Sequence, residues 1–284
     1  MGAAFVIALR EGIEAALIVS IILAYLRQLE RADRAALVWG GTAAAVSLSA
    51  IAGTVIFVAG AEFEGTTEEV FEGAVTLTAV GVLTWMIFWM RSQGARIKGE
   101  LQSKVDSALA TGGIALAALA FFAVLREGIE TALFLFAAAK GTAVGSGGVQ
   151  AQMFGALLGL VFAIVLGVLL YRGGIRMNLR TFFRVTGIVL IVVAAGLFAY
   201  SVHELQEAGW LPFLESHAFD LSTTLPDDGG LGAVLRGLVG YHAVPSALEL
   251  VAWLAYLIVV GVAYLRPHRV PAGQRTALAS TNVR

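Results

Sequence analysis

The chain has 284 residues, of which 58% are hydrophobic and 14% charged, whereas a soluble domain has about 45–50% apolar and about 25% charged residues. This composition leaves too little polar surface to enclose a water-soluble core, and it predicts a protein embedded in a lipid bilayer. The lack of cysteine excludes disulfides, thiolate metal sites and cysteine catalysis, and the net charge of -1 gives no support to nucleic-acid binding.

Seven apolar stretches are each long enough to span about 30 Å of hydrocarbon, which takes about 20 helical residues. We therefore expect an all-α integral membrane protein with seven transmembrane helices. Within the long loop that follows the sixth span, residues 230–241 read as a short interfacial helix. In chain order the predicted spans are 3–26, 37–60, 70–90, 112–138, 150–171, 183–203 and 246–265.

Charge alternates between successive loops. Lys and Arg concentrate in 27–34, 91–104, 172–184 and 266–284, whereas the intervening loops collect most of the acidic residues. Because basic loops stay on the cytoplasmic side of a membrane, this pattern predicts an amino terminus outside and a carboxyl terminus in the cytoplasm.

A nine-residue sequence occurs twice. Residues 9–17 and 125–133 match at eight of nine positions, with an offset of 116 residues. The two copies lie on spans of opposite direction, which predicts a 3+3 inverted-topology repeat plus one extra helix, an arrangement that places transporter sites near the bilayer midplane. The predicted division is 1–106 for the first three-helix repeat, 107–203 for the second, 204–245 for an extracytoplasmic loop, 246–265 for the seventh span and 266–284 for a disordered cytoplasmic tail.

The repeated sequence places charges inside the membrane. Arg10, Glu11 and Glu14 share one face of their helix near its middle. Each charge at a helix centre costs about 2.5–3.5 kcal/mol, so this face cannot meet lipid. The two copies are therefore expected to face each other, with converging carboxylates that two guanidinium groups partly neutralise and a formal charge of -2 that a multivalent cation could balance. The predicted metal ligands are Glu11, Glu14, Glu127 and Glu130, and the charge-setting residues are Arg10 and Arg126.

Carboxylate oxygens favour hard cations such as Mg, Ca, Mn and ferric iron over copper(I), and the chain has no Cys or paired His to recruit zinc. The alternative is an internal salt bridge that only fixes helix packing. A salt bridge needs one Glu for each Arg, however, and each copy carries two. The pattern therefore favours an ion site.

Weaker candidates lie on the predicted outer face. Acidic residues that begin the third span could collect cations at a pore mouth, or could simply suit a helix amino terminus. The His at the end of the sixth span could offer a second metal contact, or could only be hydrogen-bonded. Glu249, near the start of the seventh span, could line the same vestibule, but it is expected at the membrane interface. The possible entrance residues are Glu68, Glu69, Glu72, His203 and Glu204.

Arg-Glu-Gly-x-Glu on the first and fourth of seven helices resembles the oxidase-dependent iron permeases, the family of the fungal high-affinity iron permease and the bacterial EfeU-type permease. Residues 203–209, 225–228 and 240–241 look like the bacterial branch. The resemblance implies that the doubled motif, Arg10, Glu11, Glu14, Arg126, Glu127 and Glu130, translocates iron across the cytoplasmic (inner) membrane. It also implies that a partner oxidase or peroxidase changes the oxidation state of the iron, with a periplasmic peroxidase and a cupredoxin-like protein as the bacterial partners. The acidic motif of the last outer loop in fungal members is not found verbatim, which argues against their style of hand-over from a multicopper oxidase.

We therefore expect a multi-pass iron permease whose iron, ferrous or ferric, is cargo rather than cofactor. A carrier of another hard divalent cation, such as manganese, is the alternative within transport. An intramembrane enzyme is disfavoured, because the chain lacks His-Glu-x-x-His and shows no Ser-His pair within its predicted helices.

Overall fold

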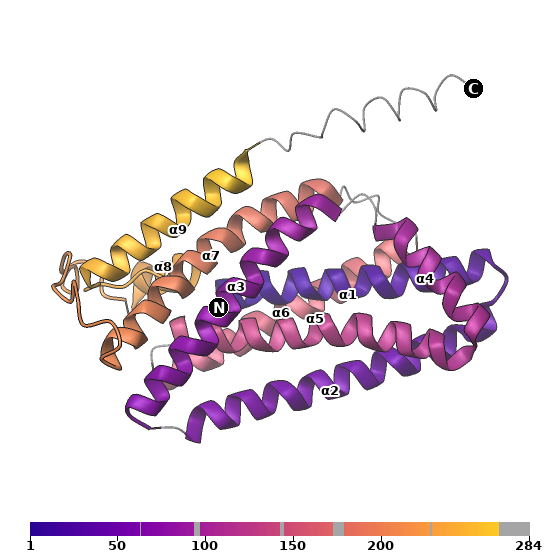
Figure 1. Cartoon of the computed structure of the whole chain (residues 1–284), viewed down its shortest axis with the longest axis horizontal. Helices are drawn as coiled ribbons and strands as arrows, with labels where there is room; N and C mark the ends of the chain where they lie inside the picture. The colour runs from indigo at the N-terminus through magenta and orange to yellow at the C-terminus, as the bar shows by residue number, and fades with distance from the viewer. Residues whose placement is uncertain (63, 94–96, 143–144, 173–178, 228, 267–284) are drawn as a thin grey trace.

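The computed structural model describes residues 1–62, 64–93, 97–142, 145–172, 179–227 and 229–266, and this part of the chain is almost entirely helical (Figure 1). Apart from an isolated bridge between His217 and Ser246, the described residues form no β-structure. The elements are α1 (Gly2–Gln28), the 3-10 turn η1 (Ala32–Arg34), α2 (Ala35–Glu62), α3 (Thr66–Gln93), α4 (Ile97–Thr111), α5 (Gly113–Thr142), α6 (Gly145–Tyr171), α7 (Leu179–Glu207), α8 (Gly230–Val239) and α9 (Ala247–Leu265).

Five described helices, α2, α3, α6, α7 and α9, are long and apolar enough to cross a membrane by length and composition. Helices α1 and α5, with 27 and 30 residues, are also long enough to span a membrane, but each carries the charged motif near its middle. They coincide with the first and fourth predicted spans. The all-helical membrane fold is thus confirmed in outline, whereas the count of seven spans and the sides of the two termini stay predictions.

The sequence predicts a loop between residues 90 and 112, but α4 forms a 15-residue helix there. Leu101, Val105 and Ala108 are buried at helical spacing and pack in one apolar cluster with residues of α1 and α5. The Tyr25 hydroxyl of α1 also donates to Asp106 at 2.8 Å. An amphipathic helix of this length lacks the apolar run that marks a span, and the predicted boundary between the repeats, at 106/107, lies inside it.

The short helix expected at 230–241 is confirmed as α8. The tail predicted at 266–284 lies outside the described residues from 267 onward, as do 94–96 and 173–178 of the basic loops and Asp228 of the outer loop. Figure 1 shows α4 and the turn between α1 and α2 at one end of the molecule, and α8 with the start of α9 at the opposite end.

The main helix contacts pair α1 with α6, α2 with α5, and α3 with α7. The first three predicted spans are α1, α2 and α3, and the next three are α5, α6 and α7. Swapping the two sets turns the α1–α6 pair into the α5–α2 pair and turns the α3–α7 pair into the same pair. Two apolar clusters lie along α1 and α5, one to either side of the charged motif. The motif therefore lies between the clusters, where the two helices cross.

Glycines permit the close crossings of these helix pairs. A Cβ atom on Gly41 of α2 would overlap the carbonyl oxygen of Ala117 in α5, and one on Gly155 of α6 would overlap that of Met1. Gly155 follows Gly41 by 114 residues, and Ala117 follows Met1 by 116. The same two offsets relate the crossings of Gly12 with Ala163 and of Gly128 with Ser49, where the Cβ atoms would lie 2.6 Å apart in both cases.

Candidate metal site between α1 and α5

Three carboxylates of the doubled motif meet where α1 and α5 cross. Glu11, Glu14 and Glu127 each present one oxygen, and these oxygens all lie within 4.8 Å of one another. The three residues are only 1%, 6% and 5% exposed. The expected face-to-face arrangement of the two motifs is therefore present in the structure, although whether these residues bind metal stays a prediction.

The two arginines are placed differently. Arg10 is 1% exposed, and its guanidinium lies 3.1 Å from Glu14 Oε1 and 3.8 Å from Glu11 Oε1. The Arg126 side chain is 37% exposed, and its Nε donates to Glu130 Oε1 at 2.8 Å. The group of three carboxylates does not include Glu130. The structure therefore brings three of the four predicted ligands together, while Glu130 is ion-paired with Arg126.

Two aromatic rings of α3 also contact the Arg126 guanidinium. Its guanidinium carbon lies 5.0 Å from the ring centroid of Trp89 and 5.6 Å from that of Trp85, within the range of cation–π attraction. Neither tryptophan was among the site residues predicted from the sequence. Their i, i+4 spacing, which places both rings on one helix face, is the signal that could have found them.

Several oxygens of the motif are buried and lack a hydrogen-bond donor among the described residues. They include both oxygens of Glu11, Oε2 of Glu127 and Oε2 of Glu130, whereas Oε1 of Glu14 has only its ion pair with Arg10. A buried carboxylate oxygen without a donor is costly, and a bound cation would satisfy it. The donor set of hard oxygens and the formal charge of -2 therefore fit a divalent metal ion.

A cavity of about 710 Å³ leads away from this cluster. Glu14, Arg126 and Glu127 line one part of it, and Glu100 and Lys104 of α4 line another, whereas Arg10 and Glu11 lie outside its lining. Glu14 and Glu127 are thus reached from the α4 end of the molecule, which is the end where the basic loops predict the cytoplasm.

The possible entrance residues on α3 lie apart from this cavity. Glu72 is 4% exposed and forms an ion pair with Lys140 of α5, and the Tyr200 hydroxyl donates to it at 2.6 Å. Glu68 lies 3.4 Å from the Lys140 amine. Glu69 is half-buried in the first turn of α3. Lys140 therefore offsets part of the negative charge expected at the pore mouth.

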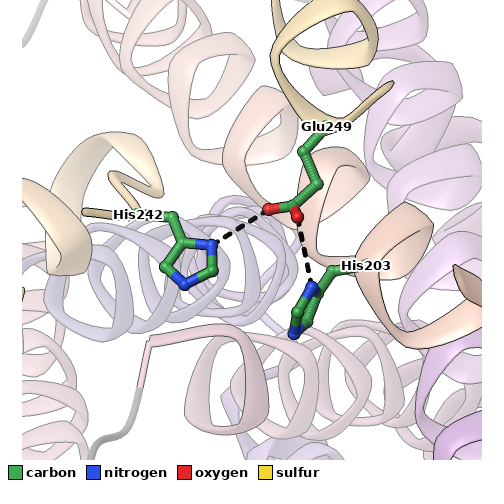
Figure 2. Close-up of side chains that lie close together, drawn as sticks. All are labelled: His203, His242 and Glu249. Carbon is green, nitrogen blue, oxygen red and sulfur yellow. Dashed lines mark hydrogen bonds and ion pairs between the residues drawn. The ribbon is translucent and has the colours of Figure 1, made fainter. Parts of the chain in front are cut away.

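His203 takes part in a second group of metal-binding side chains, with residues that the sequence analysis did not assign to any site. Figure 2 shows His203 and His242 directed at the carboxylate of Glu249, each toward a different oxygen. The two histidine Nδ1 atoms lie 3.1 Å from Glu249 Oε1 and Oε2 respectively. Glu249 is 5% exposed and lies in the first turn of α9. Glu204, by contrast, is not one of the three residues of this group.

Known proteins resemble the chain along almost its whole length. Residues 1–272 match the sequence model of the Iron permease FTR1 family. The chain is 42% identical over 271 residues to the ferrous iron permease EfeU of Escherichia coli O6:K15:H31 (strain 536), covering 94% of this chain and 96% of that protein. The EfeU protein of Shigella sonnei (strain Ss046) shows the same identity and coverage, and that of Yersinia pestis is 40% identical over 278 residues, covering 97% of each chain. No solved structure matches the chain.

Proposed function

Since this chain belongs to the iron permease FTR1 family, as its doubled motif predicts, we propose that it moves iron ions across the cytoplasmic membrane into the cell. The ion would bind where α1 and α5 cross, to the oxygens of Glu11, Glu14 and Glu127, with Glu130 joining when Arg126 releases it. The observation that carries this proposal is the group of three buried carboxylates, each with one oxygen within 4.8 Å of the other two. Several of their oxygens accept no hydrogen bond from the described residues.

The charge of the site supports ferrous iron as the cargo. Four carboxylates and two guanidinium groups sum to -2, so one Fe²⁺ ion leaves the buried cluster neutral, whereas Fe³⁺ leaves a net positive charge in the low-dielectric interior. The relatives named ferrous iron permease agree with this choice. Manganese(II) has the same charge and also accepts oxygen ligands, so it is the second candidate.

The cavity supports a transport cycle in which the two three-helix repeats rock about the site. The structure would correspond to the inward-facing state, with Glu14 and Glu127 open toward α4 while Arg10 and Glu11 are buried. The matched crossings of α1–α6 and α2–α5 are what two inverted repeats would produce. Rocking one pair against the other would close the cavity and expose the carboxylates to the opposite side.

Thiol labelling tests this orientation, because the chain has no cysteine of its own. Ala123 lines the cavity, and Glu215 is exposed on the long loop after α7. A membrane-impermeant maleimide is expected to label Ala123→Cys in inside-out vesicles and Glu215→Cys in right-side-out vesicles. If Ala123→Cys reacts only in right-side-out vesicles, the cavity opens outward and the proposed state is wrong.

The partners implied by the family resemblance, a periplasmic peroxidase and a cupredoxin-like protein, would present iron at the outer face and set its oxidation state there. We expect the translocation step itself to need neither. The carboxylates and the cavity that carry the proposal all belong to this chain.

Uptake into liposomes that contain only the purified chain tests the function and its cargo together. We expect anaerobic Fe²⁺ to accumulate well above the level of empty liposomes, and an excess of Mn²⁺ to compete at least about tenfold more weakly than unlabelled Fe²⁺. Preferential uptake of Mn²⁺ would favour the manganese carrier. Uptake of Fe³⁺ alone, or only after a peroxidase is added, would overturn the ferrous, partner-independent step.

A further inference from the structure

We propose that His203, His242 and Glu249 form a second metal site, able to bind Fe²⁺, at the end of the molecule opposite α4. The three residues come from separate elements: the last turns of α7, the segment after α8 and the first turn of α9 (Figure 2). Metal binding by this group does not depend on the function proposed above. Its use as an entrance site for iron does rest on that function and on the predicted outward orientation of this end.

The geometry suits three ligands of one ion. The ligand atoms of the group all lie within 4.8 Å of one another, and each Nδ1 atom lies 3.1 Å from an oxygen of Glu249. Adjacent ligands of an ion with bonds of about 2.1 Å are about 3 Å apart in octahedral geometry. Small rotations of the side chains would therefore place all three atoms around one ion.

The ligand types suit ferrous iron. Two histidines and one carboxylate on one side of an ion, with the remaining positions open, make up the set that non-haem Fe²⁺ proteins use. The side chains of His203 and His242 are 29% and 34% exposed, whereas that of Glu249 is 6% exposed. The ion would thus be anchored from the buried side and keep open positions toward solvent.

Each histidine also has a carboxylate within ion-pair distance of its other ring nitrogen, although neither contact is a hydrogen bond. His203 Nε2 lies 3.4 Å from Glu207 Oε1, and His242 Nε2 lies 3.9 Å from Asp227 Oδ2. Metal-binding histidines characteristically direct the second ring N–H at a carboxylate, which fixes the ring and raises its basicity. Asp227 is itself held by Arg236 at 2.8 Å.

Local sequence features hold the three ligands in place. Gly240 ends α8 with a left-handed φ of 69°, and a Cβ atom there would overlap the backbone of Gly196 in α7, so glycine is required for the segment that carries His242 to lie against α7. Glu249 is fixed by a capping box with Ser246 at the start of α9. The Ser246 hydroxyl in turn donates to Gln206 of α7 at 2.6 Å.

The group also lies beside the outer acidic residues. Glu204, adjacent to His203 in the chain, interacts with Tyr200, and Tyr200 donates to Glu72. These contacts connect the second site with the start of α3, which the sequence analysis singled out as a possible pore mouth. An ion held by His203, His242 and Glu249 would thus lie next to further carboxylates.

The test isolates the second site by removing the first. In a Glu14→Gln/Glu127→Gln chain purified in detergent, we expect anaerobic equilibrium dialysis to show one bound Fe²⁺ ion. Adding His242→Gln or His203→Gln should weaken this binding at least tenfold. Adding His217→Gln should leave it unchanged, because His217 is exposed on the same long loop and is not one of the three ligands.

Thermal unfolding distinguishes a metal site from a purely structural hydrogen-bonded clamp. In the Glu14→Gln/Glu127→Gln background, Fe²⁺ should raise the unfolding midpoint when His217→Gln is added and leave the midpoint unmoved when His242→Gln is added, even if the latter chain starts from a lower midpoint. Equal Fe²⁺ binding by the two variants would overturn the proposal. Failure of the proposed transport site would appear separately: the Glu14→Gln/Glu127→Gln chain would then bind as many Fe²⁺ ions as the unsubstituted chain.

Discussion

Replacing Glu14 or Glu127 by Gln is expected to reduce iron uptake at least a hundredfold while leaving the protein in the membrane. Glutamine keeps the size of the side chain but removes the negative charge, so the cluster can no longer neutralise Fe²⁺ and loses one of its three converging ligands. Neither change adds volume to the helix crossing. Uptake of labelled iron by cells, normalised to the amount of protein in the membrane, measures the effect.

The position of Glu130 predicts a graded result within the same motif. Its Oε1 accepts a hydrogen bond from Arg126 at 2.8 Å, and it lies outside the group of three, so Glu130→Gln should impair uptake less than Glu127→Gln. Glu215→Gln, on the exposed loop, is the matched control and should transport normally. Normal uptake by both Glu14→Gln and Glu127→Gln would refute the site, and a stronger loss from Glu130→Gln would show that the fourth carboxylate holds the ion.

The meeting of the two motifs could be predicted from the sequence because the argument needs only the cost of burying charge. Arg10, Glu11 and Glu14 cannot face lipid, and a second copy on an antiparallel helix offers the complementary surface. The unequal burial of Arg10 and Arg126 could not be predicted in this way. It depends on tryptophans of α3 and on the cavity beside α4, and neither follows from the motif itself.

Helix α4 and the His203, His242 and Glu249 group could not be predicted from the sequence. Helix α4 is too short and too polar to register as a span, although its buried Leu101, Val105 and Ala108 have helical spacing. The second site joins residues up to 46 positions apart across the long outer loop, and pairing across such a loop depends on how the loop folds. His203 was a candidate metal contact from its place at the end of the sixth span, and the capping box of Glu249 is visible locally as Ser-x-x-Glu before an apolar run.

The neighbouring glycines of α2 are expected to respond in opposite ways to the same substitution. A methyl group on Gly41 would overlap the carbonyl oxygen of Ala117 and lie 3.2 Å from the backbone nitrogen of Phe121. Because both partners are backbone atoms, no side-chain rotation relieves the overlap and α2 must move away from α5. Gly41→Ala should therefore destabilise the protein by about 1–3 kcal/mol and lower its unfolding midpoint in detergent by about 4 °C or more.

Gly40→Ala is the control, because a Cβ atom at Gly40 meets nothing within 4 Å and alanine is up to about 1 kcal/mol more favourable in a helix interior. The midpoint of this variant should stay the same or rise. The repeat adds a further expectation: Gly155→Ala, at the matching crossing of α6 with α1, should destabilise in the same direction, because its Cβ atom would overlap the carbonyl oxygen of Met1. Equal midpoints for Gly40→Ala and Gly41→Ala would mean that α2 and α5 do not cross this closely. The packing that positions α5, and with it the second motif, would then be wrong.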